Sequence, residues 1–480
     1  MADTQKNTID TPCSAYNTMA LHWDLINDLL GGTLAMRAAG RKWLPIEPKE
    51  EELSYSNRLD RSILFTAYAD TIDDLASRPF SKPVTIQGEL PENLADLPDN
   101  CDGEGTGLTQ FARSLFDACL NYGLTHILVD YPLTAVSQGQ TLTLADEQRS
   151  GFKPYFVHIK PNQLIGWKWE KGKNGKPQLT QIRWKISRTE PSDSYGEKTI
   201  NEIRVMTLNT WEIHTANDKG EYSLTQQGTH TYPDGIPLVT CYVNKTGFMT
   251  ARPPLEGLAW LNLAHWQGYS DQKNLLRFIR FPLLFFKGIA QEEIDKSVII
   301  GPGRKFSSSN PNADAKFLEH SGAGADAGRQ DLKDTEERMS TLGLEPLMSR
   351  SGGQTATGQA IDESKSQSSI QAWIRSQESA ITNLFKMAAR WVGGELPDDF
   401  KLDIYNDFGV SIRAAADIDA LIKMRQGGEI DRETFLREVK RRALLSEMTD
   451  ITSVMQKIDE EGPPLASFGR DANNNGGGAN

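Results

Sequence analysis

The residue types that most often bind metals are scattered along this chain. None of its seven histidines belongs to an HxH or HxxxH pair, whereas a zinc site needs ligands that converge on one point. The four cysteines form no CxxC pair and are separated by irregular gaps. We therefore expect surface or core histidines, reduced structural thiols, and neither a metal site nor a cofactor. The residues concerned are His22, His126, His158, His214, His230, His265 and His320, with Cys13, Cys101, Cys119 and Cys241.

Two glycine-rich runs and two acidic pairs are the other candidates for chemistry. The runs Gly103–Gly107 and Gly322–Gly328 lack the strand and βαβ context of a dinucleotide fingerprint. The chain also has no GxxxxGK[ST] and no GxSxG motif. The pairs Asp73-Asp74 and Asp398-Asp399 could serve a two-metal nuclease, but each also suits a helix end that faces water. We predict no catalytic residue and a protein that is not an enzyme.

One polar loop, residues 347–358, is suited to contact rather than catalysis. It is longer than a tight helix–helix connection needs, and it carries a single cation in an acidic chain. Two interpretations stay open: a plain linker, or a mobile loop that touches a phosphate backbone weakly and without sequence preference. The predicted contact residues are Ser349, Arg350, Ser351, Gly352, Gly353, Gln354 and Thr355.

Composition limits the class of protein. A length of 480 residues suggests roughly two to four domains. The hydrophobic and charged fractions, 38% and 24%, are typical of a folded soluble protein. A net charge of −12 argues against a protein that grips nucleic acid broadly, because such binding depends on phosphate neutralisation by Lys and Arg. The first residues lack an apolar signal core, and the most apolar run, Phe281–Phe286, is too short to span a bilayer, so we expect no membrane insertion.

Apolar spacing predicts the elements of the first half. Helices are expected at Tyr16–Leu30, Ser54–Ser77 and Leu108–Tyr122, followed by a buried strand at His126–Asp130. Residues 152–243 then change to short β-prone runs separated by turn signals, which predicts a β-rich module. The runs are Tyr155–Ile159, Leu164–Trp169, Gln181–Ile186, Glu202–Leu208, Trp211–His214 and Leu238–Val243.

Long helices dominate the second half. Apolar periodicity predicts helices at Pro253–Arg280, Asp326–Leu342 and from about Thr357 to Val392, the first of them about 40 Å long. Between the first two lie β-like runs at Leu283–Lys287, Ser297–Ile300 and Ala315–Leu318. Short amphipathic helices broken at Gly427-Gly428 are expected from 411 to 460, and the last residues should be disordered.

The helix predicted at Asp326–Leu342 mixes charges of both signs. As a solvated face this pattern is ordinary. In a ring of parallel helices it would give ion pairs between copies, with the acidic surplus facing the hole. The residues alone leave both interpretations open, and the candidates for lining a channel are Asp331, Asp334 and Glu337. Because long helices with little core of their own often pack against copies of themselves, the pattern favours a multimeric assembly.

The order of these segments resembles the portal (head–tail connector) proteins of tailed bacteriophages. A β-rich module, a long helix, a small insertion, an acidic helix, a polar loop and a second long helix follow one another as in that family. The resemblance covers roughly residues 16–460. Short stretches that support it are Gly40–Pro45, Tyr55–Asp60, Ile300–Gly303, Phe317–Gly322, Glu337–Glu345 and Gln354–Ala360.

The resemblance implies an α+β, ring-forming fold with a wing, a helical stem, a small clip and a helical crown. Residues 1–251, including the β-rich module 152–243, would form the wing together with a long helix and strand at 359–408. The stem helices would be 252–280 and 326–346, joined by the clip, 281–325. Residues 347–358 would be the tunnel loop, 409–462 the crown and 463–480 a disordered tail.

The resemblance also implies partners and a location. The family assembles as a homo-oligomeric ring, usually a dodecamer, in the host cytoplasm, and lies at one capsid vertex of the virion. Double-stranded viral DNA passes through it without sequence specificity. The clip, with Lys287, Glu292, Glu293 and Lys296, would dock the terminase and later the head–tail adaptor; capsid and scaffolding proteins are further partners. The alternatives are another oligomeric virion scaffold, of tail or capsid, or a nucleic-acid-processing enzyme with an unrecognised site.

Overall fold

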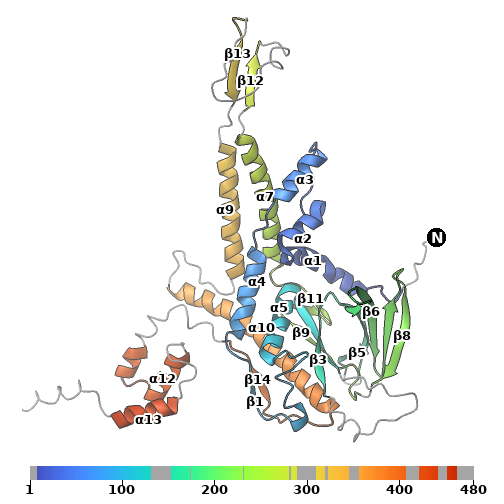
Figure 1. The fold of residues 1–480 in the computed structure, drawn as a ribbon. Helices are drawn as coiled ribbons and strands as arrows, with labels where there is room; N and C mark the ends of the chain where they lie inside the picture. Colours follow the sequence, from blue (N-terminus) through green and yellow to red (C-terminus); the bar gives the residue numbers. More distant parts are fainter. Residues whose placement is uncertain are drawn as a thin grey trace, which may run out of the picture. The chain divides into compact units, whose positions relative to one another are not determined.

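A computed structural model describes most of the chain (Figure 1). The residues described are 8–130, 153–172, 175–230, 232–280, 283–288, 310–318, 323–344, 356–406, 421–441 and 451–461. They divide into two units, Met1–Asn406 and Asp407–Asn480. The first unit mixes helices and antiparallel sheets, as the α+β prediction requires. Among the described residues, no helix is long and apolar enough to cross a membrane.

The N-terminal part is helical. Its helices are α1 (Ser14–Leu30), α2 (Gly32–Ala39), α3 (Glu52–Arg61), α4 (Ala67–Ser77) and α5 (Leu108–Tyr122). Short 3-10 turns lie at Gly40–Lys42, Arg78–Phe80 and Glu92–Leu94. The prediction for α5 is confirmed at both ends. Gly31 ends α1 as predicted, but its φ of −70° is helical, so α2 follows after a single residue.

The single helix predicted at Ser54–Ser77 is wrong. The backbone turns extended at Ser62 and resumes as α4 at Ala67. The side chain of Asn262, a buried residue of α7 (Glu256–Ile279), stabilises this break. It accepts a hydrogen bond from the Tyr68 N–H at 3.0 Å and donates one to the Phe65 carbonyl at 2.8 Å. Since that partner is far away in sequence, local periodicity could not reveal the break.

Two antiparallel sheets share one core. The three-stranded sheet has the order β3-β2-β9 and the five-stranded sheet the order β4-β5-β6-β7-β8. Leu128 and Ile159 of the first sheet pack against Leu164, Ile182 and Trp184 of the second. The strands are β2 (Leu124–Asp130), β3 (Tyr155–Ile159), β4 (Leu164–Lys171), β5 (Pro177–Pro191), β6 (Glu197–Thr207), β7 (Thr210–Ala216), β8 (Tyr222–Thr229) and β9 (Leu238–Tyr242).

Two helices contact the three-stranded sheet. They are α5 and the second half of α10 (Ala356–Trp391), and the ring of Phe156 on β3 joins them. Its centroid lies 6.0 Å from that of Phe111 on α5 and 5.4 Å from that of Phe385 on α10. The apolar repeat predicted for the later part of α10 is buried, at Ile370, Ile374, Ile381, Leu384 and Ala388. Two small sheets complete this part, β1 (Thr85–Gln87) with β14 (Lys401–Asp403), and β10 (Lys245–Gly247) with β11 (Thr250–Ala251).

The two rod-like helices are α7 and α9 (Ala323–Leu344), which pair side by side (Figure 1). At about 1.5 Å per residue they are roughly 36 and 33 Å long. Between them in the sequence lies an antiparallel hairpin, β12 (Leu283–Lys287) and β13 (Asp314–Leu318). The runs predicted at 283–287 and 315–318 are therefore strands, and the run at 297–300 lies outside the described residues.

The second unit is helical where it is described. A helical segment at 421–426 ends at Gly427-Gly428, as predicted, and Gly428 takes a φ of 78°. It is followed by α12 (Arg432–Arg441) and α13 (Ile451–Glu461). The tail predicted to be disordered, 463–480, lies outside the described residues.

Candidate channel hairpin and its anchor

The α7–α9 pair is close because glycines lie on the seam. A Cβ at Gly328 of α9 would come within 2.1 Å of the Gln272 amide oxygen on α7, and one at Gly268 would lie 3.4 Å from Leu332. The same Gln272 donates to the Ala325 carbonyl at 2.7 Å. A second polar contact joins the two helices further along: His265 Nε2 on α7 lies 3.1 Å from the Glu336 carboxylate on α9. The seam is therefore held by polar contacts and close backbones rather than by a wide apolar interface.

The rest of α9 is exposed and charged. Met339 is the one large hydrophobic side chain of α9 that is buried among those described, and Leu342 is 37% exposed. The predicted channel residues Asp331, Asp334 and Glu337 are all exposed on this helix. Asp334 accepts a hydrogen bond from Gln330 at 2.7 Å, and Glu337 lies 3.8 Å from the Lys333 ammonium. Such exposed pairs add little stability, about 0–1 kcal/mol each.

The N-terminal segment contacts α7 along the first two-thirds of the helix. Trp260, half-exposed, meets Trp43 edge-on with ring centroids 6.4 Å apart. Gln267 donates to the Trp43 carbonyl at 2.8 Å, and the His265 ring packs at a tilt of 43° against that of Phe65, with centroids 5.1 Å apart. The N-terminal helices thus fix where α7 stands, and α9 is positioned through α7 and through α4.

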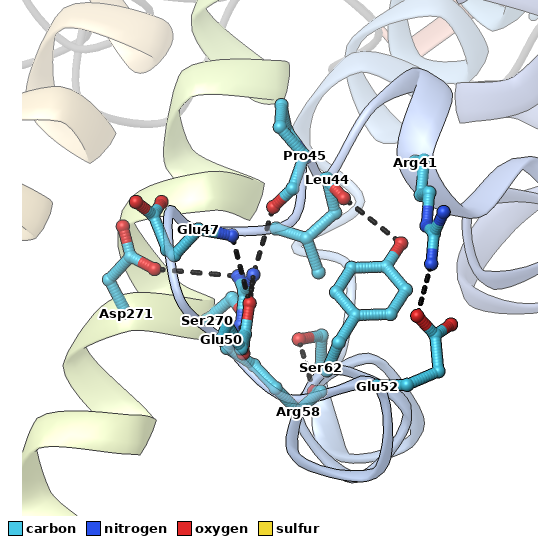
Figure 2. A network of polar contacts seen from close by, with 11 residues as sticks. Arg41, Leu44, Pro45, Glu47, Glu50, Glu52, Arg58, Ser62, Ser270 and Asp271 are labelled. Carbon is cyan, nitrogen blue, oxygen red and sulfur yellow. Dashed lines mark hydrogen bonds and ion pairs between the residues drawn. The ribbon is translucent and has the colours of Figure 1, made fainter.

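Arg58 lies at the centre of the polar contacts between the N-terminal segment and α7 (Figure 2). Its side chain is 4% exposed and forms a fork-to-fork pair with Glu50, at 2.8 and 2.7 Å. It also donates to the Pro45 carbonyl at 2.9 Å. On the α7 side, Ser270 Oγ lies at 3.5 Å and the Asp271 carboxylate at 3.6 Å. A planar guanidinium suits such a bidentate site, which a lysine would not reproduce.

Electrostatics follow from this geometry. The hydrogen bonds from Arg58 hold the pKa of Glu50 below its usual value, and those same bonds raise the pKa of Arg58. Burial raises the pKa of Asp271 on the neighbouring turn of α7. The Tyr55 hydroxyl donates a hydrogen bond to the Leu44 carbonyl at 3.0 Å. The Arg58 guanidinium carbon lies over the Tyr55 ring, 5.5 Å from the ring centroid. The cluster therefore stays ionised and paired at neutral pH.

This cluster joins two of the stretches that carried the sequence resemblance. Leu44 and Pro45 end the stretch 40–45, while Tyr55 and Arg58 belong to the stretch 55–60. Sequence reasoning noted both stretches but missed that they meet against α7. The sequence carries no local signal for this contact, because Ser270 of α7 lies 212 residues from Arg58 in the chain.

The remaining predicted site residues are only partly described. Lys287 ends β12, is exposed, and lies opposite Asp314 in the hairpin; Phe285, 44% exposed, lies opposite Lys316. Glu292, Glu293 and Lys296 lie outside the described residues, and so do Ser349, Arg350, Ser351, Gly352, Gly353, Gln354 and Thr355. Helix α10 begins at Ala356, so the last three residues of the predicted loop 347–358 are helical.

One acidic pair and one glycine-rich run have structural partners, whereas Asp398 and Asp399 are exposed. Asp73 pairs with Arg113 and Asp74 with Arg78, each at 2.8 Å. In the run Gly103–Gly107 the backbone N–H groups already bond to Asp102 and Asn100, which leaves them unsuited to a phosphate. Within the described part of the chain, no group of three or more His, Cys, Asp or Glu residues could hold a metal ion.

Two histidines belong to the core of the three-stranded sheet. His126 on β2 bonds to Thr240 at 3.0 Å, and His158 on β3 bonds to Thr125 at 2.8 Å. Burial lowers the pKa of His126 to about 3 and that of His158 to about 4. Both are therefore neutral near pH 7, as the expectation of core histidines implies.

Comparison with known proteins adds the following. A family model described as "Domain of unknown function (DUF4055)" matches residues 254–392, the stretch that contains α7, β12, β13, α9 and α10. No curated protein matches the chain. Three solved structures of gene transfer agent (GTA) particles are similar to this chain over most of their length.

The three structures show different states or parts of GTA particles. The first, the neck of an empty GTA particle computed with C6 symmetry, is 13% identical with a TM-score of 0.41, over 79% of this chain and 90% of that one. The second, the neck of a native GTA particle computed with C12 symmetry, is 12% identical with a TM-score of 0.40, over 77% and 88%. The third, the virion of a native GTA particle, is 12% identical with a TM-score of 0.42, over 84% and 97%.

Proposed function

We propose that this protein is a portal protein of a tailed bacteriophage. Copies assemble into a closed ring at one capsid vertex, at the head–tail junction of the virion. The ring is the channel for packaging and ejection of double-stranded viral DNA, and it docks the terminase and then the head–tail adaptor. It has no enzymatic activity of its own, because its part is to position the DNA and the motor.

The observation that carries this proposal is the α7–α9 hairpin. Helix α7 is fixed by the N-terminal segment, whereas α9 contacts α7 and α4 and leaves most of its surface exposed. A helix that is polar on nearly every side gains stability from ion pairs or from neighbours outside its own core. In a ring of copies, the mixed charges of α9 supply ion pairs between adjacent hairpins.

The charge of α9 also suits a DNA channel. Asp331, Asp334 and Glu337 are exposed and spaced three residues apart, so they follow one another along the helix surface. Carboxylates repel phosphate, and a lining that repels the polymer prevents it from sticking. The proposed tunnel loop, residues 347–358, lies between α9 and the body of α10 in the sequence, and its Arg350 supplies one weak, sequence-independent phosphate contact.

The β12–β13 hairpin is the proposed docking surface for the terminase and the adaptor. It is joined to the rest of the chain through the ends of α7 and α9, and it exposes Phe285, Lys287 and Lys316. Aromatic side chains such as Phe285 are enriched at protein–protein interfaces. Lys287→Glu should weaken binding of the motor without unfolding the protein, and unchanged motor binding would contradict this placement.

Electron microscopy of the purified full-length chain tests the proposal. Annular particles with an open axial channel are expected, and addition of linear double-stranded DNA should not block ring formation. Flat sheets or open filaments would favour another virion scaffold instead. Compact single globules under all buffer conditions would overturn the proposal.

A further inference from the structure

A two-stranded arm extends from the five-stranded sheet. Strands β5 and β6 pair without a register shift as far as Pro191 opposite Glu197. Along β5, β4 reaches only to Trp184, and along β6, β7 reaches only to Glu202. Residues 187–201 are thus bonded to no other described strand. Because a lone hairpin is marginally stable in water, an ordered arm needs internal contacts to hold it.

Those contacts lie at the base and at the tip. At the base, Arg188 pairs with Glu202 at 2.8 Å. Beside the tip, Lys198 on β6 pairs at 2.9 Å with Asp218, which lies in the turn between β7 and β8. At the tip, the Asp193 carboxylate accepts hydrogen bonds from the N–H groups of Tyr195 and Gly196. A Cβ at Gly196 would lie 2.8 Å from that carboxylate, so a larger residue there would displace the Asp193 side chain. The tip is therefore preformed.

The tip displays one aromatic side chain. Tyr195 is 100% exposed. The tip residues 191–197 also include two carboxylates, those of Asp193 and Glu197, and no Lys or Arg. Such a tip repels nucleic acid, which favours cations, and suits a basic protein surface with an apolar patch. Tyrosine is a common anchor at interfaces because it adds large contact area with few rotatable bonds.

The opposite end of the same sheet has the complementary chemistry. Trp169 near the end of β4 is 46% exposed, and its exposed neighbours Lys168, Glu170 and Lys171 carry a net positive charge. Lys171 follows two residues after Trp169 and so lies on the same face of the strand. The Trp169 ring lies 5.4 Å from that of Phe248, which fixes its position. Strand β5 begins beside this patch, at Pro177 opposite Lys171, and ends at the arm tip. Its 15 residues span about 50 Å.

We propose that the arm tip of one copy docks on the Trp169 patch of a second copy. Tyr195 packs against Trp169, and Glu197 pairs with Lys171. Because donor and acceptor surfaces lie at opposite ends of one sheet, the contact is head-to-tail and repeats from copy to copy, as a closed ring requires. The inference rests on the proposed function for the presence of a second copy, and it adds an interface that the α7–α9 hairpin does not use.

Photo-crosslinking tests this contact directly. p-Benzoylphenylalanine replaces Tyr195 in the full-length chain, with Gln227 on the exposed strand β8 as the control position. Mixing isotopically light and heavy copies separates cross-links between copies from those within one. We expect position 195, but not 227, to cross-link to residues 168–171 of a second copy. Assembled protein in which position 195 cross-links elsewhere, to DNA, or not at all overturns the inference while leaving the ring intact.

A charge swap gives an independent measurement. Glu197→Lys and Lys171→Glu should each weaken association, by about threefold or more, and the double variant should restore it. Tyr195→Ala should weaken association about tenfold. Glu89→Lys, an equal charge change at an exposed turn of another sheet, is the control. The contact is contradicted if the two single variants associate as strongly as the control, or if the double variant associates more weakly than either single variant. A chain that stays monomeric at all concentrations overturns both this inference and the proposed function.

Discussion

Replacing Glu50 by Gln should destabilise the anchor of α7 far more than replacing Glu52 by Gln. Glu50 is 11% exposed and neutralises the buried guanidinium of Arg58 through two hydrogen bonds. Its loss leaves a buried cation whose nearest remaining carboxylate, Asp271, lies 3.6 Å away. Breaking a buried pair in this way costs about 3–5 kcal/mol, and the slight exposure of Glu50 favours the lower end.

Glu52 provides a matched control two residues further on. It pairs with Arg41, but the two side chains are 73% and 57% exposed, so its loss should cost at most about 1 kcal/mol. Urea unfolding followed by tryptophan fluorescence measures the first cooperative transition of each variant, with Trp43 and Trp260 reporting on the anchor. If the two variants shift that transition equally, Arg58 does not hold α7 as argued.

Three further predictions concern the core of the three-stranded sheet, the α7–α9 pair and the proposed tunnel loop. Between pH 6.5 and 4.5 the free energy of unfolding should fall by about 2 kcal/mol through His126, because the unfolded chain takes up a proton in this range and the buried ring does not. A smaller pH dependence of urea unfolding in His126→Gln would confirm it. Gly328→Ala should destabilise α9 by about 1–3 kcal/mol through its clash with Gln272, whereas Gly257→Ala, with nothing within 4 Å, should be neutral or stabilising in thermal unfolding. Arg350→Glu should leave assembly intact and impair DNA packaging or retention in a packaging assay, and normal packaging would rule out the loop contact.

Local pattern was sufficient where an element is strongly periodic and has its own stop signal. Helix α5 ends at Gly123, whose φ of 84° suits the left-handed C-cap that glycine provides, and both ends match the prediction. The later part of α10 was predictable for the same reason, since its apolar repeat is its buried face. Such elements are specified by their own residues.

Pattern was insufficient where tertiary contacts decide. Strand β8 was missed because it is an exposed edge with little apolar alternation, and the arm of β5 and β6 was shortened because its residues are polar on both faces. The α3–α4 break depends on Asn262, and the Arg58 cluster depends on a turn of α7 far along the chain. For the break and the cluster the deciding partner is distant in sequence, so spacing alone carries no trace of it.

Native mass spectrometry of the full-length chain over a range of concentrations tests the central claim most directly. A closed ring predicts a single species whose mass stops growing with concentration, roughly 640 kDa for twelve copies of the 53.4 kDa chain. A 53.4 kDa monomer at every concentration, or a mass that rises without limit, would contradict it.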